Sequence, residues 1–134
     1  MGELKSLRIE RKLTQNQAAD ILGVSLRSYK SYENDEKKLA AFMKKEITEG
    51  IEGTGIKARI IGEIGTSKDV ITEAEMKVFK AAILAHLETG IPITTHTSLG
   101  TMGHEQIELF KLYGVELDKV VIGHVDLTGN VEYI

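Results

Sequence analysis

One carboxylate and two imidazoles recur along this chain, each after a short run rich in Ile, Val or Thr. They are Glu63 in GEIG, His96 in TTHTS and His124 in GHVD. If each run is a strand of a repeating β/α unit, the three side chains gather at the carboxyl ends of neighbouring parallel strands, where such enzymes hold their chemistry. One carboxylate with two imidazoles suits a divalent metal of the hydrolytic kind. The spacing therefore predicts a metal site.

The part of the chain that must position these residues alternates between predicted strands and helices. Helices are expected at 39–49, 72–88 and 103–113, and strands at 56–61, 92–95 and 120–122. Thr72 and Glu75 have the spacing of a capping box at the start of the second helix, and Gly90 and Gly114 end the second and third helices. This order predicts right-handed β-α-β crossovers and a parallel sheet.

Composition limits the class of protein. The chain has 134 residues, of which 42% are hydrophobic, so one domain or two small folded pieces are expected. The absence of Cys excludes disulfides and thiolate metal sites. No apolar stretch approaches the roughly 18 residues of a membrane span, so we expect no membrane contact and a cytoplasmic location. Residues 1–38 carry eight Lys or Arg and six Asp or Glu, whereas 39–134 carry nine and fourteen.

The first 38 residues predict an all-α segment. Helices are expected at 3–12, 15–22 and 25–33, with Thr14 and Ser25 as N-caps and Gly23 at a left-handed turn. The pattern LTQNQAADILGVSLRSYKSYEND resembles the Cro/CI-type (XRE-like) helix-turn-helix family. That resemblance implies duplex DNA as a partner, contacted through Gln15, Ser25, Arg27, Ser28, Lys30 and Ser31.

Two observations weigh against DNA reading. Basic residues on the outer face of a short helical segment are usually just solvated, and the sequence changes character near Leu39, before the two further helices of that family. A core of fewer than about 40 residues rarely holds alone. We therefore expect a truncated helix-turn-helix at 1–38 that depends on a second unit at 39–134.

The stretches EITEGIEGTGIKARIIGEIGTS, ITTHTSLGTMG and KVVIGHVDL resemble the phosphotriesterase family of metal-dependent hydrolases, in the expected order and spacing. The resemblance implies a (β/α)8 TIM-barrel architecture, of which residues 39–134 would supply about three strands. It also implies that Glu63 bridges two divalent metals, as in the glutamate branch of the family, and that His96 and His124 ligate one of them. Zn²⁺ is the first expectation and Mn²⁺ the alternative.

Other parts of the family pattern have no counterpart in the chain. The H-x-H pair of the first strand and the aspartate of the eighth strand are absent, and residues 39–134 fall well short of the roughly 250 residues of a full barrel. We therefore expect weak metal binding and incomplete catalysis by the chain alone. Exposed strand edges would favour self-association.

Each candidate residue also has a structural interpretation. Glu63 could be a solvated carboxylate, and a strand His is often only hydrogen-bonded. Side chains near His96 could support ligands by hydrogen bonding or simply fill the strand and loop: Thr94, Thr95, Thr97 and Ser98. His86 and His104 are expected on the surface.

Three functions stay open at this point. The first is a phosphotriesterase-like hydrolase fragment that cleaves ester, lactone or phosphoester bonds with metal-activated water. The second is a DNA-binding transcriptional regulator whose β/α part serves packing, oligomerisation or small-molecule sensing. The third is a fusion of two truncated segments that folds only partly or through self-association.

Overall fold

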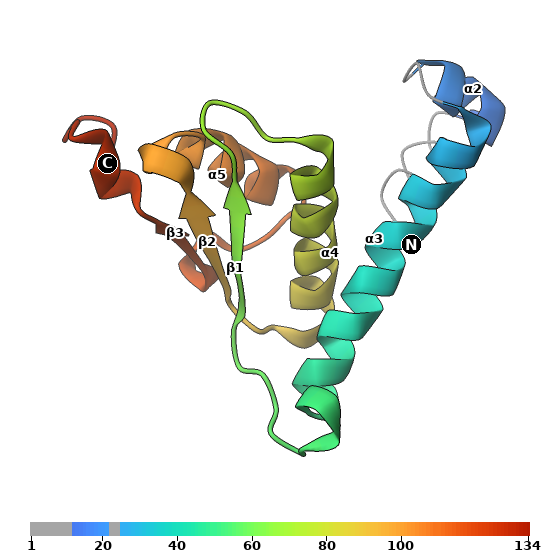
Figure 1. The fold of residues 1–134 in the computed structure, drawn as a ribbon, viewed down its shortest axis with the longest axis horizontal. Coiled ribbons are helices and arrows are strands. Elements are labelled where there is room, and N and C mark those ends of the chain that lie inside the picture. The colour runs from blue at the N-terminus through green and yellow to red at the C-terminus, as the bar shows by residue number, and fades with distance from the viewer. Residues whose placement is uncertain (1–11, 22–24) are drawn as a thin grey trace.

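The computed structural model describes residues 12–21 and 25–134 and shows a small parallel sheet with helices against it (Figure 1). The sheet contains β1 (Ile61–Thr66), β2 (Ile93–Thr97) and β3 (Val120–Gly123), in the order β1-β2-β3 and all parallel. The helices are α2 (Gln15–Ile21), α3 (Leu26–Thr48), α4 (Glu73–Thr89) and α5 (Gly103–Leu112). The predicted β-α-β-α-β order and the α/β class of this part are confirmed.

The hydrophobic core lies between the sheet and helices α4 and α5. Phe79 of α4 and Phe110 of α5 are fully buried with ring centroids 5.7 Å apart, and they pack with Ile93 of β2 and Ile61 of β1. Burying aromatic and branched side chains of this size supplies most of the stabilisation available to a small domain. The helices thus cover one face of the sheet and leave the other face open.

Helix α4 begins and ends where the sequence predicts. The Thr72 side chain accepts a hydrogen bond from the Glu75 backbone N–H, and the Glu75 carboxylate accepts one from the Thr72 backbone N–H. Gly90 ends the helix in the left-handed conformation that glycine adopts without steric cost. These signals are local in sequence, which is why the sequence alone locates them.

The first strand begins later than predicted. Residues 56–60 precede β1 as irregular backbone, and Ile56 and Ile60 are 68% and 51% exposed. Ile61 is the first of this run to be buried, and its backbone N–H donates to the carbonyl of Pro92. The prediction of a strand at 56–61 was wrong because, within the described part of the chain, Ile56 and Ile60 are left largely uncovered.

Helix α3 is one continuous helix from Leu26 to Thr48, where two separate helices were predicted. No Gly or Pro lies between these residues, so no residue in the segment disfavours helix enough to end it. The helix lies along α4 (Figure 1), and Lys44 forms an ion pair with Glu88 of α4. It ends before Gly50, whose φ is +116°.

Helix α2 packs against the N-terminal end of α3, away from the sheet (Figure 1). Its predicted cap is confirmed, since the Gln17 backbone N–H donates to the Thr14 hydroxyl and the Thr14 N–H donates to the Gln17 side chain. The predicted helix at 3–12 and the turn at Gly23 lie outside the described residues, except for Lys12 itself. Helix-turn-helix geometry for this segment stays a prediction.

Among residues 12–21 and 25–134, none of the helices combines the length and the apolar character needed to cross a bilayer.

Candidate metal centre

A β-bulge directs Glu63 toward the open face of the sheet. In the pairing of β1 with β2, Ile61 lies opposite Ile93 and Ile64 opposite Thr95, so two residues of β1 face one residue of β2. Gly62 has a φ of +131°, and a Cβ there would stand 2.3 Å from a backbone oxygen of β2. The carboxylate therefore lies within β1, not beyond its end as predicted.

The two imidazoles lie on the next two strands. His96 is the fourth residue of β2 and pairs with Gly123 of β3. His124 directly follows β3 with a φ of +64°, a conformation that is uncommon outside glycine and concentrated at functional sites. The structure thus brings the sequence-predicted residues Glu63, His96 and His124 together from three adjacent strands.

The three side chains surround one small space. Glu63 Oε1 lies 3.4 Å from His124 Nε2, and Glu63 Oε2 lies 3.7 Å from His96 Nδ1. The centroids of the His96 and His124 rings are 4.6 Å apart, and the ring planes are inclined at 59° to each other. One ligand atom from each side chain can be chosen so that all lie within 4.8 Å of one another. Each side chain is between 42% and 47% exposed, so the space opens to solvent.

These distances fit a shared cation better than direct hydrogen bonds. An N–H···O bond has its usual length near about 2.9 Å, whereas two ligands of a tetrahedral ion with bonds of about 2.1 Å lie about 3.4 Å apart. Carboxylate oxygen and imidazole nitrogen are also the donors that Zn²⁺ and related ions accept. The residues present therefore fit a single divalent ion.

Two glycines keep the space around the carboxylate and imidazoles clear. A Cβ at Gly123 would stand 3.3 Å from Glu63 Oε1, and a Cβ at Gly65 would stand 3.3 Å from the Cβ of His96. Neither residue was singled out in the sequence, because the space that each leaves is defined by a neighbouring strand.

On the opposite face of the sheet, buried polar side chains tie the strand ends together. The Thr97 hydroxyl donates to the carbonyl of Gly123 at 2.7 Å, and the Thr95 hydroxyl donates to the Gln106 side chain at 2.6 Å. Sequence reasoning left these threonines as ligand support or filler and missed Gln106. The available signal was a Gln on the face of α5 that otherwise presents Leu109 and Phe110 to the core.

The loops that follow β1 and β2 are joined by hydrogen bonds. The Ser98 hydroxyl donates to the Thr66 carbonyl at 2.8 Å, and the Asp69 backbone N–H donates to the Thr101 hydroxyl at 2.9 Å. Ser67 donates to the Glu75 carboxylate, which anchors the first of these loops to α4. The rim around the triad is therefore fixed by side chains on both of its loops.

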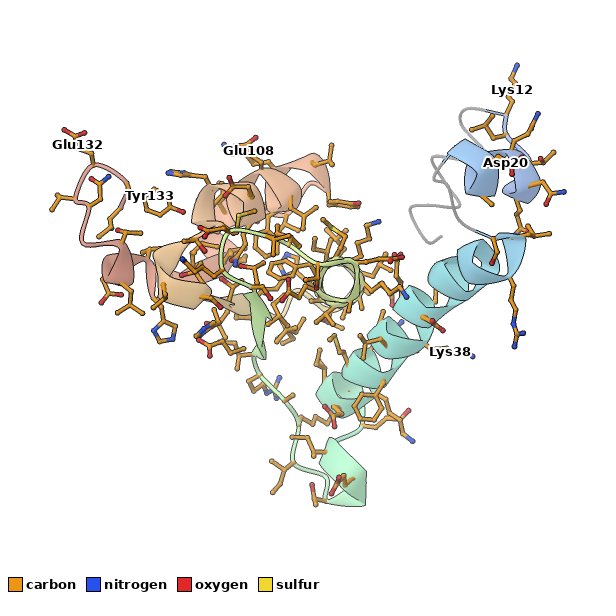
Figure 2. The ribbon with its side chains drawn as sticks, turned by 45° about the horizontal axis from the view of Figure 1, so that its top comes forward. Lys12, Asp20, Lys38, Glu108, Glu132 and Tyr133 are labelled. Atoms are coloured by element: carbon orange, nitrogen blue, oxygen red, sulfur yellow. The ribbon has the colours of Figure 1, made fainter. Side chains whose placement is uncertain are left out.

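The other two histidines of the chain lie apart from the triad. His86 was predicted on the surface, but it is only 6% exposed and its Nδ1 lies 2.8 Å from the Ile91 carbonyl oxygen. That correction arises because His86 lies on the same face of α4 as the core residue Phe79, seven residues earlier, and lines one pocket with Gly114 and Lys119. His104 is exposed, as predicted, and its ring meets Tyr133 edge-on at 4.5 Å. Figure 2 shows Tyr133 in the C-terminal segment near α5.

The residues predicted to contact DNA lie at the other end of the molecule. Gln15 begins α2 and is partly buried, while Ser25 and Arg27 are exposed at the start of α3. Ser28, Lys30 and Ser31 belong to α3, but their side chains lie outside the described part. Figure 2 shows Lys12 and Asp20 at this tip and Lys38 further along α3.

Comparison with known proteins identifies relatives for most of the chain. The model of the phosphotriesterase family matches residues 24–134. A phosphotriesterase homology protein of Escherichia coli is 55% identical over 97 residues, which cover 72% of this chain and 33% of that protein. An aryldialkylphosphatase of Saccharolobus solfataricus is 39% identical, covering 66% of this chain and 28% of its own.

Solved structures agree with these matches. The crystal structure of the Escherichia coli phosphotriesterase homology protein, with phosphate in its active site, has a TM-score of 0.70 at 54% identity and covers 72% of this chain and 33% of that one. A lactonase from Listeria monocytogenes has a TM-score of 0.70 at 40% identity, covering 78% and 32%. The chain thus spans about a third of the length of the relatives it matches.

Proposed function

The chain belongs to the phosphotriesterase family, and on that premise we propose that Glu63, His96 and His124 hold a divalent metal ion for hydrolysis of an ester, lactone or phosphoester bond. The observation that carries the proposal is the spacing of the triad. Oxygen and nitrogen atoms 3.4 and 3.7 Å apart lie near the ligand-to-ligand distances around an ion, and the three residues come from β1, β2 and the end of β3.

The ion would supply Lewis-acid polarisation of the scissile carbonyl or phosphoryl group and would favour ionisation of the attacking water. The residues of this chain do the holding and orienting. Glu63 offers one carboxylate oxygen toward each imidazole, so it sets the distance between His96 and His124. The roughly half-exposed side chains leave a path for a substrate to approach from solvent.

The substrate class rests on relatives of similar sequence. Hydrolysis of organophosphates and lactones is named for proteins that are 38–40% identical to this chain over the aligned residues, and an N-acetyltaurine hydrolase of Homo sapiens is 36% identical over 92 residues. All three names refer to substrates with a hydrolysable carbonyl or phosphoryl group, which a metal ion could polarise. We therefore assign the reaction class to this site and leave the leaving group open. Zn²⁺ is the proposed ion and Mn²⁺ the alternative.

Metal content tests the site directly. The full chain and its Glu63→Gln, His96→Ala and His124→Ala variants are equilibrated with Zn²⁺ or Mn²⁺, dialysed, and measured by elemental mass spectrometry. His104→Ala is the matched control, because it removes an exposed imidazole outside the triad. We expect the wild type and the control to retain metal and each triad variant to bind at least about tenfold more weakly. Equal occupancy in all five proteins would refute the site.

Duplex DNA is a second candidate partner, supported by one observation. Helix α2 begins at Gln15 and α3 begins just after Ser25, close to the starts that the sequence predicts for the two helices of a DNA reader. The Arg27 side chain is exposed to solvent near the start of α3. Fluorescence anisotropy with duplex DNA at about 50 and 200 mM salt tests it, since phosphate contacts make affinity fall steeply with salt. Arg27→Ala should weaken binding and Lys38→Ala should not. Absence of saturable binding at the lower salt concentration would eliminate this candidate.

A further inference from the structure

We propose that Gln106 is the positioning residue of this metal site, because its amide fixes the ends of β1 and β2 at the separation that Glu63 and His96 require. The inference rests on the proposed function, because a positioning role matters to catalysis only if Glu63, His96 and His124 hold a metal ion. Its structural part concerns the polypeptide alone, and can be tested without metal.

The Gln106 side chain is fully buried in α5, and its amide is bonded on both sides. Its Nε2 donates to the Thr66 hydroxyl at 2.8 Å and to the His96 carbonyl at 3.1 Å. Its Oε1 accepts from the Thr95 hydroxyl at 2.6 Å. Both N–H groups of the amide are therefore used, and they reach two different strands.

The bonded groups lie next to the metal ligands. One acceptor is the backbone carbonyl of the ligand His96 itself, and another is the side chain of Thr66, three residues after Glu63 on β1. On the same face of the sheet the Thr97 hydroxyl holds the carbonyl of Gly123, the residue before His124. Contacts from the helix-covered face thus hold the backbone at His96 and next to His124, and hold the Thr66 side chain at the end of the strand that carries Glu63.

Packing alone would not require an amide at this position. Helix α5 fills the core at Phe110 with an apolar side chain, and an apolar residue of similar volume would fill the place of Gln106 as well. A buried amide is costly unless it is bonded, and here each bond is made to a strand end. An apolar replacement would leave the hydroxyls of Thr66 and Thr95 and the carbonyl of His96 without this partner.

The first experiment compares Gln106→Met with Phe110→Leu in the full chain, using Zn²⁺ alone as the probe. Both variants alter a buried side chain of the same helix, but only the first touches the hydrogen bonds to the strands. We expect Gln106→Met to weaken Zn²⁺ binding by about 10- to 100-fold in a chelator competition assay. Phe110→Leu should stay within about twofold of the wild type even though it lowers stability. Equal loss in the two variants would overturn the proposal.

The second experiment is free of metal and measures amide hydrogen exchange by NMR. We expect Gln106→Met to speed exchange at residues 64–66 and 95–97 more than elsewhere, and Phe110→Leu to speed it throughout the core. Uniform acceleration in Gln106→Met would count against the positioning role. If the wild type binds no Zn²⁺, the proposed function fails while this comparison still decides the role of Gln106. If Gln106→Met does not fold, Thr66→Val takes its place, because it removes one contact of the same amide.

Discussion

Gly123 of β3 and Glu63 of β1 share one space, although their strands are separated by β2. A methyl group on Gly123 would stand 3.3 Å from Glu63 Oε1 and 2.4 Å from the Thr95 carbonyl oxygen. The second contact is far inside van der Waals distance, so the backbone would have to shift. The absence of a side chain at position 123 is thus a condition for the carboxylate to face the imidazoles.

Gly123→Ala should therefore damage both stability and the site. We expect a loss of about 1–3 kcal/mol in the free energy of unfolding, as for other overpacked positions, together with weaker Zn²⁺ binding. Urea denaturation and chelator competition measure the two effects. Gly65→Ala is the milder comparison, because its closest contact is the Cβ of His96 at 3.3 Å. An unperturbed Gly123→Ala protein would contradict the geometry described for β3.

We expect the Glu75 carboxylate to make a pH-dependent contribution to the free energy of unfolding. Partial burial raises the pKa of Glu75, but hydrogen bonds from the Ser67 hydroxyl and the Thr72 backbone N–H lower that pKa by more, so it lies below its ordinary value. A carboxyl with a lowered folded-state pKa stabilises the fold above its unfolded pKa of about 4.3, and this contribution disappears as the pH falls through the folded-state value.

Glu75→Gln tests this contribution. The variant should be less stable than the wild type by on the order of 1 kcal/mol at pH 7, and the difference should shrink as the pH falls below about 4. Thermal or urea unfolding at several pH values measures it. A difference that is constant from pH 7 to pH 3 would show that the Glu75 charge contributes nothing.

Among single truncations, we expect Phe79→Ala to cause the largest loss in the free energy of unfolding. It is fully buried and packs on Phe110 with centroids 5.7 Å apart. Phe79→Ala should cost about 3–5 kcal/mol through lost burial and a residual cavity. Since small domains are stable by about 5–15 kcal/mol, this loss would remove a large share of the free energy of unfolding. Circular dichroism against urea concentration checks this, with Phe42→Ala, 59% exposed, as the tolerant control.

We expect copies of this chain to self-associate through the outer edges of the sheet, to an extent that rises with protein concentration. Within the described residues β1 and β3 each pair with β2 alone, so each presents an outer edge. Sedimentation velocity over a range of protein concentrations should show dimers or larger species. Val121→Lys should reduce them, because a charged residue on an edge strand opposes strand pairing. Leu112→Lys, at an exposed position on α5 and not on a strand edge, should not. A monomer at every concentration would exclude this association.

The sequence predicted the features that depend on near neighbours in the chain. The caps at Thr14 and Thr72 and the stop at Gly90 each rest on residues within one helical turn. The convergence of Glu63, His96 and His124 also followed from sequence, because a regular β/α repeat sets its parallel strands side by side, although Glu63 lies within β1 and not past its end.

Features that depend on a distant partner were missed. The bulge that aims Glu63 exists only opposite β2, and His86 is buried beside residues far along the chain, Gly114 and Lys119. Gln106 looked like an ordinary helix residue until its contacts with Thr66 and His96 placed it under the site. The sequence also predicted a gap between helices near Lys38, where the composition changes. The gap is absent because the residues on both sides of Lys38 favour helix, so α3 continues through it.

The uninterrupted course of α3 determines where this polypeptide can be cut or joined. A deletion of residues 1–38 would cut α3 in the middle and leave a helix of about ten residues. That is shorter than the roughly 12–15 residues that an isolated helix needs to be stable in water. The deletion would also remove Glu36, whose carboxylate approaches Lys80 of α4 at 3.7 Å. The turn at 51–55, which follows the end of the helix and is exposed throughout, is the better junction for a graft, a tag or a protease site.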